Sequence, residues 1–219
     1  MKGVILSLPT KTKAKRECRD FTLSVFLKRY LWVLVFTLFF AAGVVWGAVT
    51  SVKASEDFLL DMDFLFTTNL QSRLSVGVVS SFAAHFASNF IFFVLAVLCG
   101  LSTWGTGALP FVVAFKGFGT GLSAAFLIST YGLKGLGFYL VVVLPGTFIF
   151  SLALMFLCSE SAKVSARIAR YLFKGKDSSV PLSAFVKSYL LRCAYFLLLS
   201  AAGALCDMFF WSFVSKLFF

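Results

Sequence analysis

The sequence predicts an all-α fold: a polytopic membrane bundle of about five transmembrane helices, with amphipathic helices at the membrane interface. Of its 219 residues, 60% are hydrophobic and only 13% are charged, whereas a soluble domain is about 45–50% apolar and about 25% charged. Apolar runs close to the roughly 20 residues that cross a bilayer recur along the chain. Little chain remains for a folded domain outside the membrane, so residues 1–219 are expected to form a single integral membrane domain.

The chain begins with a polar, basic head, residues 1–30, which holds eight Lys or Arg against two acidic residues. The apolar run 31–52 follows and is expected to be the first span. It exceeds the roughly 7–15 residues of a signal-peptide core and lacks a small-residue cleavage site, which indicates a retained anchor. Gly43 and Gly47 form a GxxxG pair in this span, which is either a helix-packing face or a chance match.

Residues 53–75 form a more acidic segment whose apolar residues recur at helical spacing, which predicts an external amphipathic helix. Its acidic residues do not have the spacing of an EF-hand loop, so a solvated face is favoured over a calcium site. We take Asp57, Asp61 and Asp63 as the candidate external contact.

The second span, 78–100, carries a polar stripe on one helical face, made of Ser81, His85, Ser88 and Asn89. Polar side chains at this depth are expected to face protein or water and not lipid. His85 is the only histidine of the chain, and no nucleophile–base pair accompanies it. A hydrogen-bonded structural histidine is therefore favoured over a catalytic one.

The third span, 107–130, contains the most costly residue of the chain, Lys116. A lysine at the bilayer centre costs about 2.5–3.5 kcal/mol on insertion scales. It either snorkels towards the surface or belongs to a functional or assembly centre. Glycines directly after it would let a neighbouring helix approach closely: Gly117, Gly119 and Gly121. Residues 131–134 are expected to make the turn into the next span.

The fourth span, 135–157, is interrupted near its middle by Pro145 and Gly146, where a kink is expected. Asn89, Lys116 and this break fall at similar depth on three consecutive spans, so we predict a hydrogen bond from the Lys116 ammonium to Asn89. The candidate assembly or functional core comprises His85, Asn89, Lys116, Gly117, Gly119, Gly121 and Pro145.

Residues 159–187 form a second basic segment before the last span, 188–214. Four basic residues recur at spacings of four, three and four, which predicts one charged stripe of an amphipathic helix on the lipid surface: Lys163, Arg167, Arg170 and Lys174. A solvated tail next to the membrane is the simpler alternative.

The distribution of basic residues predicts the orientation. The head and the 159–187 segment hold eight and six Lys or Arg, whereas the loops 53–75 and 131–134 hold two and one. Basic residues near span ends are enriched on the cytoplasmic side. A cytoplasmic N-terminus and an external C-terminus are therefore expected for this multi-pass protein.

Composition also bears on which function classes remain open. The net charge of +11 comes from residues that flank apolar spans, so attraction to anionic lipid explains it better than nucleic-acid binding. The five cysteines show no CxxC or metal-ligand spacing and resemble small buried hydrophobes. We expect no catalytic, cofactor-binding or metal-binding residues.

Three stretches carry a resemblance to a known family: Asn89 in a polar-then-apolar second span, Ala108-Leu-Pro-Phe leading to Phe115-Lys-Gly-Phe-Gly-Thr-Gly, and Leu144-Pro-Gly in the next span. Together with the basic head and the five-span layout, they resemble the stage II sporulation protein M family from about residue 30 onwards. The lysine–glycine stretch is the most specific part of the likeness.

The resemblance implies a non-enzymatic component of the engulfment machinery in the cell membrane of endospore-forming bacteria. Members of that family scaffold two external peptidoglycan-degrading partners, stage II sporulation proteins D and P, at the septal membrane. Homo-oligomers and contacts with membrane lipids are further expected interactions.

Transport is the alternative function, because substrate sites often lie where membrane helices are broken near the midplane. A subunit of a small-molecule or lipid permease fits the polar cluster. The chain offers few intramembrane charges, and five spans are few for a transporter that works alone.

Overall fold

The computed structural model describes residues 11–53, 78–174 and 182–218, and their side chains over 30–53, 82–173 and 186–211. Everything in these ranges apart from short connections is helical, which confirms the predicted all-α class. The helices are α1 (Lys11–Lys53), α5 (Val78–Leu101), α6 (Gly105–Phe138), the π-helix η1 (Tyr139–Val143), α7 (Leu144–Lys174) and α8 (Leu182–Phe218). The predicted external segment 53–75, with Asp57, Asp61 and Asp63, lies almost entirely outside the described residues.

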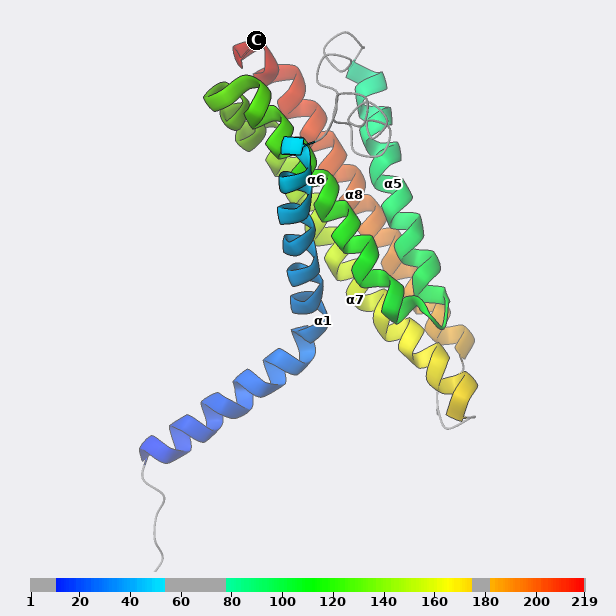
Figure 1. Cartoon of the computed structure of the whole chain (residues 1–219). Coiled ribbons are helices and arrows are strands. Elements are labelled where there is room, and N and C mark those ends of the chain that lie inside the picture. Colours follow the sequence, from blue (N-terminus) through cyan, green and yellow to red (C-terminus); the bar gives the residue numbers. More distant parts are fainter. Residues whose placement is uncertain (1–10, 54–77, 175–181, 219) are drawn as a thin grey trace, which may run out of the picture.

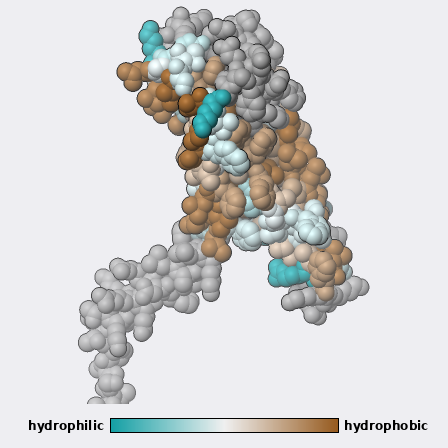
Figure 2. Space-filling model, in the orientation of Figure 1, coloured by the Kyte–Doolittle hydropathy of each residue, from teal (hydrophilic) through white to brown (hydrophobic). Residues whose placement is uncertain are grey.

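Helices that are long and apolar enough to cross a membrane number four in the described residues. They are Tyr30–Lys53, Phe82–Leu101, Gly105–Phe173 and Val186–Trp211. In Figure 1, successive helices run in alternating directions, and the N-terminal part of α1 leaves the bundle at an angle. Hydrophobic residues cover most of the coloured face in Figure 2. Large apolar side chains such as Trp46, Phe111 and Leu198 point outwards, as expected for a surface that faces lipid.

The candidate span Gly105–Phe173 is 69 residues long because helical structure continues through a reversal of the chain. Gly132 lies at the reversal with φ 59° and ψ −134°, a conformation outside the helical region. Glycine adopts positive φ without the steric cost that a side chain brings. The turn predicted at residues 131–134 is thereby confirmed.

The break predicted at Pro145 takes the form of a π-helix. Pro145 cannot donate a backbone hydrogen bond, and its ring crowds the carbonyl four residues earlier, that of Val141. That carbonyl lies inside η1, where the helix widens to a π-turn. Helical structure then resumes in α7 with Pro145 in its first turn.

Glycine contacts join α1 and α6, the most extensive helix pair among the described residues. Each helix brings two glycines, four residues apart, against the backbone of the other. A Cβ added to these glycines would come within 2.0–2.3 Å of a carbonyl oxygen: Gly43 to Ala114, Gly47 to Phe118, Gly117 to Phe40 and Gly121 to Val44. The GxxxG pair of the first span is thus a packing face, and it meets a second GxxxG pair in α6.

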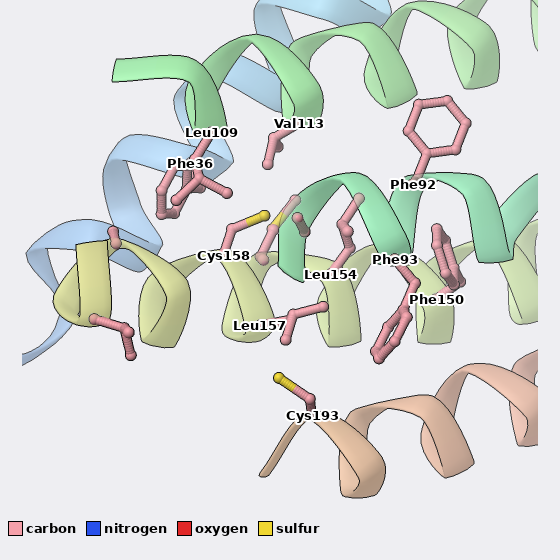
Figure 3. Close-up of a cluster of buried hydrophobic side chains, with 14 of the residues drawn as sticks. Phe36, Phe92, Phe93, Leu109, Val113, Phe150, Leu154, Leu157, Cys158 and Cys193 are labelled. Carbon is pink, nitrogen blue, oxygen red and sulfur yellow. The ribbon is translucent and has the colours of Figure 1, made fainter. Parts of the chain in front are cut away.

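The apolar core gathers side chains from all five long helices (Figure 3). Phe36, Phe92, Leu109 and Phe150 are almost completely buried there. Cys158 and Cys193 belong to the same cluster, and the cysteines with described side chains are free. Two of them therefore behave as the small buried hydrophobes that the sequence predicted.

The lower end of α7 extends the bundle beyond the predicted span end at residue 157. Ser161 and Ser165, one turn apart, are buried. The Ser161 hydroxyl shares a 2.8 Å hydrogen bond with the Tyr189 hydroxyl of α8. Ser165 donates to the Ser102 carbonyl at 2.7 Å and accepts from the Thr106 amide at 3.0 Å. These bonds fasten the α5–α6 connection to α7, so residues up to 165 pack in the bundle instead of lying on lipid.

Candidate functional core

The polar face of α5 points into the bundle, as predicted. His85, Ser88 and Asn89 are all buried, with Asn89 only 1% exposed. The side chain of Ser81 lies outside the described side chains. A polar stripe with this orientation must find partners on the other helices, because an unpaired polar group is costly in an apolar interior.

Lys116 is the first of these partners. Its side chain is 5% exposed, and its Nζ donates a 2.8 Å hydrogen bond to Asn89 Oδ1. The ammonium also lies 5.0 Å from the ring centroids of Phe92 on α5 and Phe150 on α7, within range of cation–π attraction. The predicted bond to Asn89 is confirmed, and the snorkelling alternative is wrong, because the ammonium ends in the core.

The second pair joins His85 on α5 to Asp207 on α8. Nε2 of His85 meets Oδ2 of Asp207 as a buried pair, and the Asp207 carboxylate lies against α7 at Gly146, where any Cβ would overlap it. The sequence analysis did not include Asp207 in the core. Depth could have identified it: His85 and Asp207 lie four and six residues from the midpoints of their predicted spans, both towards the end predicted to be external.

The two pairs form one electrostatic cluster. The carboxylate of Asp207 acts on Lys116 and on Tyr139 as well as on His85. Charge interactions are strong in an interior of low dielectric constant, where they also determine whether a charge is tolerated at all. Four helices, α5, α6, α7 and α8, therefore meet around one buried cation and one buried carboxylate.

Two atoms of this cluster make no hydrogen bond to the described part of the chain: Asn89 Nδ2 and Asp207 Oδ1. Both belong to buried side chains. Lysine only donates, so the hydrogen bond from Lys116 requires Asn89 to present its oxygen and leaves the amide NH₂ to find another acceptor. The core thus retains one hydrogen-bond donor, the Asn89 amide, and one acceptor, the Asp207 carboxylate oxygen, that no described residue satisfies.

The other predicted core residues have separate roles. Gly117 and Gly121 face α1 and shape the α1–α6 contact, while Gly119 is buried. Pro145 is half-buried, and the residue that contacts Asp207 is its neighbour Gly146. The glycines thus bring α1 close to α6 but do not contribute groups to the polar cluster.

The basic stripe lies at the opposite end of α7 from η1. Glu160, which the sequence analysis did not include, accepts a 2.6 Å bond from Lys163 and a second from Arg192 of α8. Lys163 and Arg170 are exposed and Arg167 is half-buried; the side chain of Lys174 lies outside those described. Glu160 therefore ties the stripe of α7 to α8.

No cluster of three or more His, Cys, Asp or Glu side chains occurs within the described residues. The arrangement can hold a buried charge in place and join helices to one another. Comparisons of the chain with protein-family models, with curated proteins and with solved structures found no match.

Proposed function

We propose that the protein is a non-enzymatic membrane scaffold that anchors or recruits peptidoglycan-remodelling proteins at the septal membrane, as in sporulation engulfment. The observation that carries this proposal is the internal use of Lys116. Its ammonium is bound by Asn89, flanked by two phenyl rings and balanced by Asp207. A cation held by its own bundle serves assembly of a rigid platform better than exchange of a substrate.

The proposed topology has five passes, 31–52, 78–100, 107–130, 135–157 and 188–214. The reversal at Gly132 supports it, because it divides the 69-residue apolar segment into two antiparallel helices. The α5–α6 connection, the C-terminal end of α7 and the N-terminal end of α8 lie at one end of the bundle, and the N-terminal part of α1 points towards the same end (Figure 1). The proposed side for that end is the cytoplasm, since the basic residues gather there.

The proposed location and partners follow from the resemblance to the stage II sporulation protein M family: the bacterial cell membrane, and external hydrolases such as stage II sporulation proteins D and P. The proposed contact is the acidic group Asp57, Asp61 and Asp63, on the external side of this topology.

Affinity purification of the tagged full-length protein from mild detergent extracts, followed by mass spectrometry, tests this function. The expected result is enrichment of external cell-wall hydrolases, reduced when Asp57, Asp61 and Asp63 are changed to Lys. Protein levels should stay normal, because the acidic face of this segment is expected to be solvated and exposed charges contribute little to stability. A matched change of Asp57, Asp61 and Asp63 to Glu, which keeps the charge, should leave the hydrolases bound. Absence of hydrolases from the wild-type eluate would contradict the proposal.

A transporter subunit is the alternative, and one observation favours it. Asn89 Nδ2 and Asp207 Oδ1 remain without hydrogen bonds to the described chain, beside a π-helix, a feature frequent at functional sites. A substrate or coupling ion could bind there. Co-purification of an ATPase, together with uptake lost in Lys116→Met at normal protein level, would favour transport over the scaffold.

A further inference from the structure

A groove between α7 and α8 is lined by both polar and apolar side chains. It encloses about 560 Å³, within the roughly 300–1,000 Å³ of small-molecule sites. Tyr30 and Val33 of α1 close one side. Four apolar side chains belong to its lining: Val33, Phe156, Leu191 and Phe196. An adjoining cavity of about 290 Å³ shares Glu160, Lys163, Ser188 and Arg192 with it.

Basic groups dominate the polar part of these two cavities. Four lining residues are basic, Lys163, Arg167, Arg170 and Arg192, and one is acidic, Glu160. Glu160 holds Lys163 and Arg192 towards each other from two helices. Cations thus converge on a hollow whose described lining holds one carboxylate, and such a hollow attracts an anion.

The position of the groove selects the kind of anion. It lies where the apolar runs of α1, α7 and α8 give way to basic residues, at Arg29, Lys163 and Arg192. Tyrosines, which favour the level of lipid headgroups, stand at its rim as Tyr30 and Tyr195. A ligand that fits has a phosphate, which binds the arginines, and a hydrocarbon chain, which packs against the apolar lining residues.

We propose that this groove binds one anionic phospholipid, with the headgroup phosphate between Arg192, Lys163 and Arg167 and an acyl chain along Phe156, Leu191 and Phe196. Basic pockets between membrane helices are a known mode of lipid headgroup recognition. The bound lipid joins α7 to α8, which both contribute lining residues. This site stands independently of the scaffold function proposed above.

Native mass spectrometry of the full-length protein, titrated with lipid in a neutral detergent, tests the site. Dioleoyl-phosphatidylglycerol should bind more tightly than dioleoyl-phosphatidylcholine, which has the same chains and a zwitterionic headgroup. Arg192→Gln and Arg167→Gln should each weaken phosphatidylglycerol binding about fivefold, equivalent to roughly 1 kcal/mol per basic residue. Lys134→Gln, which changes an exposed lysine at the other end of the bundle, is the matched control and should have no effect.

Glu160→Gln gives a change in the opposite direction. It removes the carboxylate that competes for Lys163 and Arg192, so phosphatidylglycerol should bind more tightly, a result that misfolding cannot imitate. Equal binding of the two lipids, or an Arg192→Gln variant indistinguishable from Lys134→Gln, would overturn the proposal. Glycerol phosphate, which lacks chains, should not displace the lipid at equal concentration; displacement would assign the groove to soluble phosphate esters and overturn the lipid assignment. If Arg192→Gln unfolds, a Glu160→Gln variant with unchanged or weaker binding decides against the site.

Discussion

His85 and Asp207 meet inside the bundle although 121 residues of sequence separate them. The pair connects α5 to α8, and Gly146 of α7 leaves the room that the carboxylate occupies. Lys116 lies close enough to interact electrostatically with the same carboxylate. The stability of the four-helix meeting point should therefore depend on Asp207 more than on any other polar residue of the core.

Asp207→Asn should lower the free energy of unfolding by about 3–5 kcal/mol, because it leaves the Lys116 ammonium buried without its carboxylate. Chemical unfolding of the purified protein in micelles measures this. The control is Glu160→Gln, which removes a carboxylate whose partners are substantially exposed and should cost about 0.2–1 kcal/mol. In a double-mutant cycle, His85→Gln and Asp207→Asn should be non-additive by about 0.5–3 kcal/mol. Strict additivity would show that the two side chains do not interact.

Lys116→Met should reach near-normal abundance and cost about 1 kcal/mol, the typical value of a polar contact in a membrane protein. The change keeps the length of the side chain, removes the charge, and leaves Asp207 with His85. Because the ammonium is enclosed by its own bundle, partner co-purification should stay at the wild-type level. Immunoblotting of membranes and quantitative pull-down measure the two quantities. Normal abundance with lost partners would show that something outside this chain recognises the lysine.

Gly47→Ala should destabilise the protein by about 1–3 kcal/mol, in the range of overpacked sites. Its new Cβ would lie 2.0 Å from the Phe118 carbonyl oxygen, which is part of the α6 backbone and cannot rotate away. Gly107→Ala, in the same helix as Phe118, is the control: nothing lies within 4 Å of its Cβ, and alanine favours a helix by about 1 kcal/mol. Thermal unfolding of both variants should give shifts of opposite sign. Equal shifts would mean that α1 is not held by this contact.

Reporter fusions at Lys176 should behave as cytoplasmic, whereas fusions near Asp61 and after Phe219 should behave as external. The physical reason is the concentration of Lys and Arg in the head and in the 159–187 segment. A paired phosphatase and fluorescent-protein reporter at each site gives the assignment. An external signal at Lys176 would contradict the five-pass topology.

Local patterns and depth were sufficient to predict the all-α class, the turn at residues 131–134 and the bond between Lys116 and Asn89. The bond was predictable because both residues lie near the centres of adjacent spans, where polar groups have few alternatives. The packing of α7 beyond Leu157 was not predicted. The basic residues on its outer face indicated a surface helix, and the small polar Ser161 and Ser165 on its inner face gave no signal of burial. Asp207 was missed because periodicity within α8 does not reveal which helix will face it.

The order of synthesis makes the His85–Asp207 contact one of the last to form during biogenesis. The ribosome delivers His85 and Lys116 to the membrane well before Asp207, which belongs to the last helix. Until that helix arrives, the nascent bundle holds a cation in an apolar setting without its carboxylate, and a chain that ends before residue 207 keeps this defect permanently. Asp207 is thus the side chain whose arrival, with the last helix, balances the buried charge of the core.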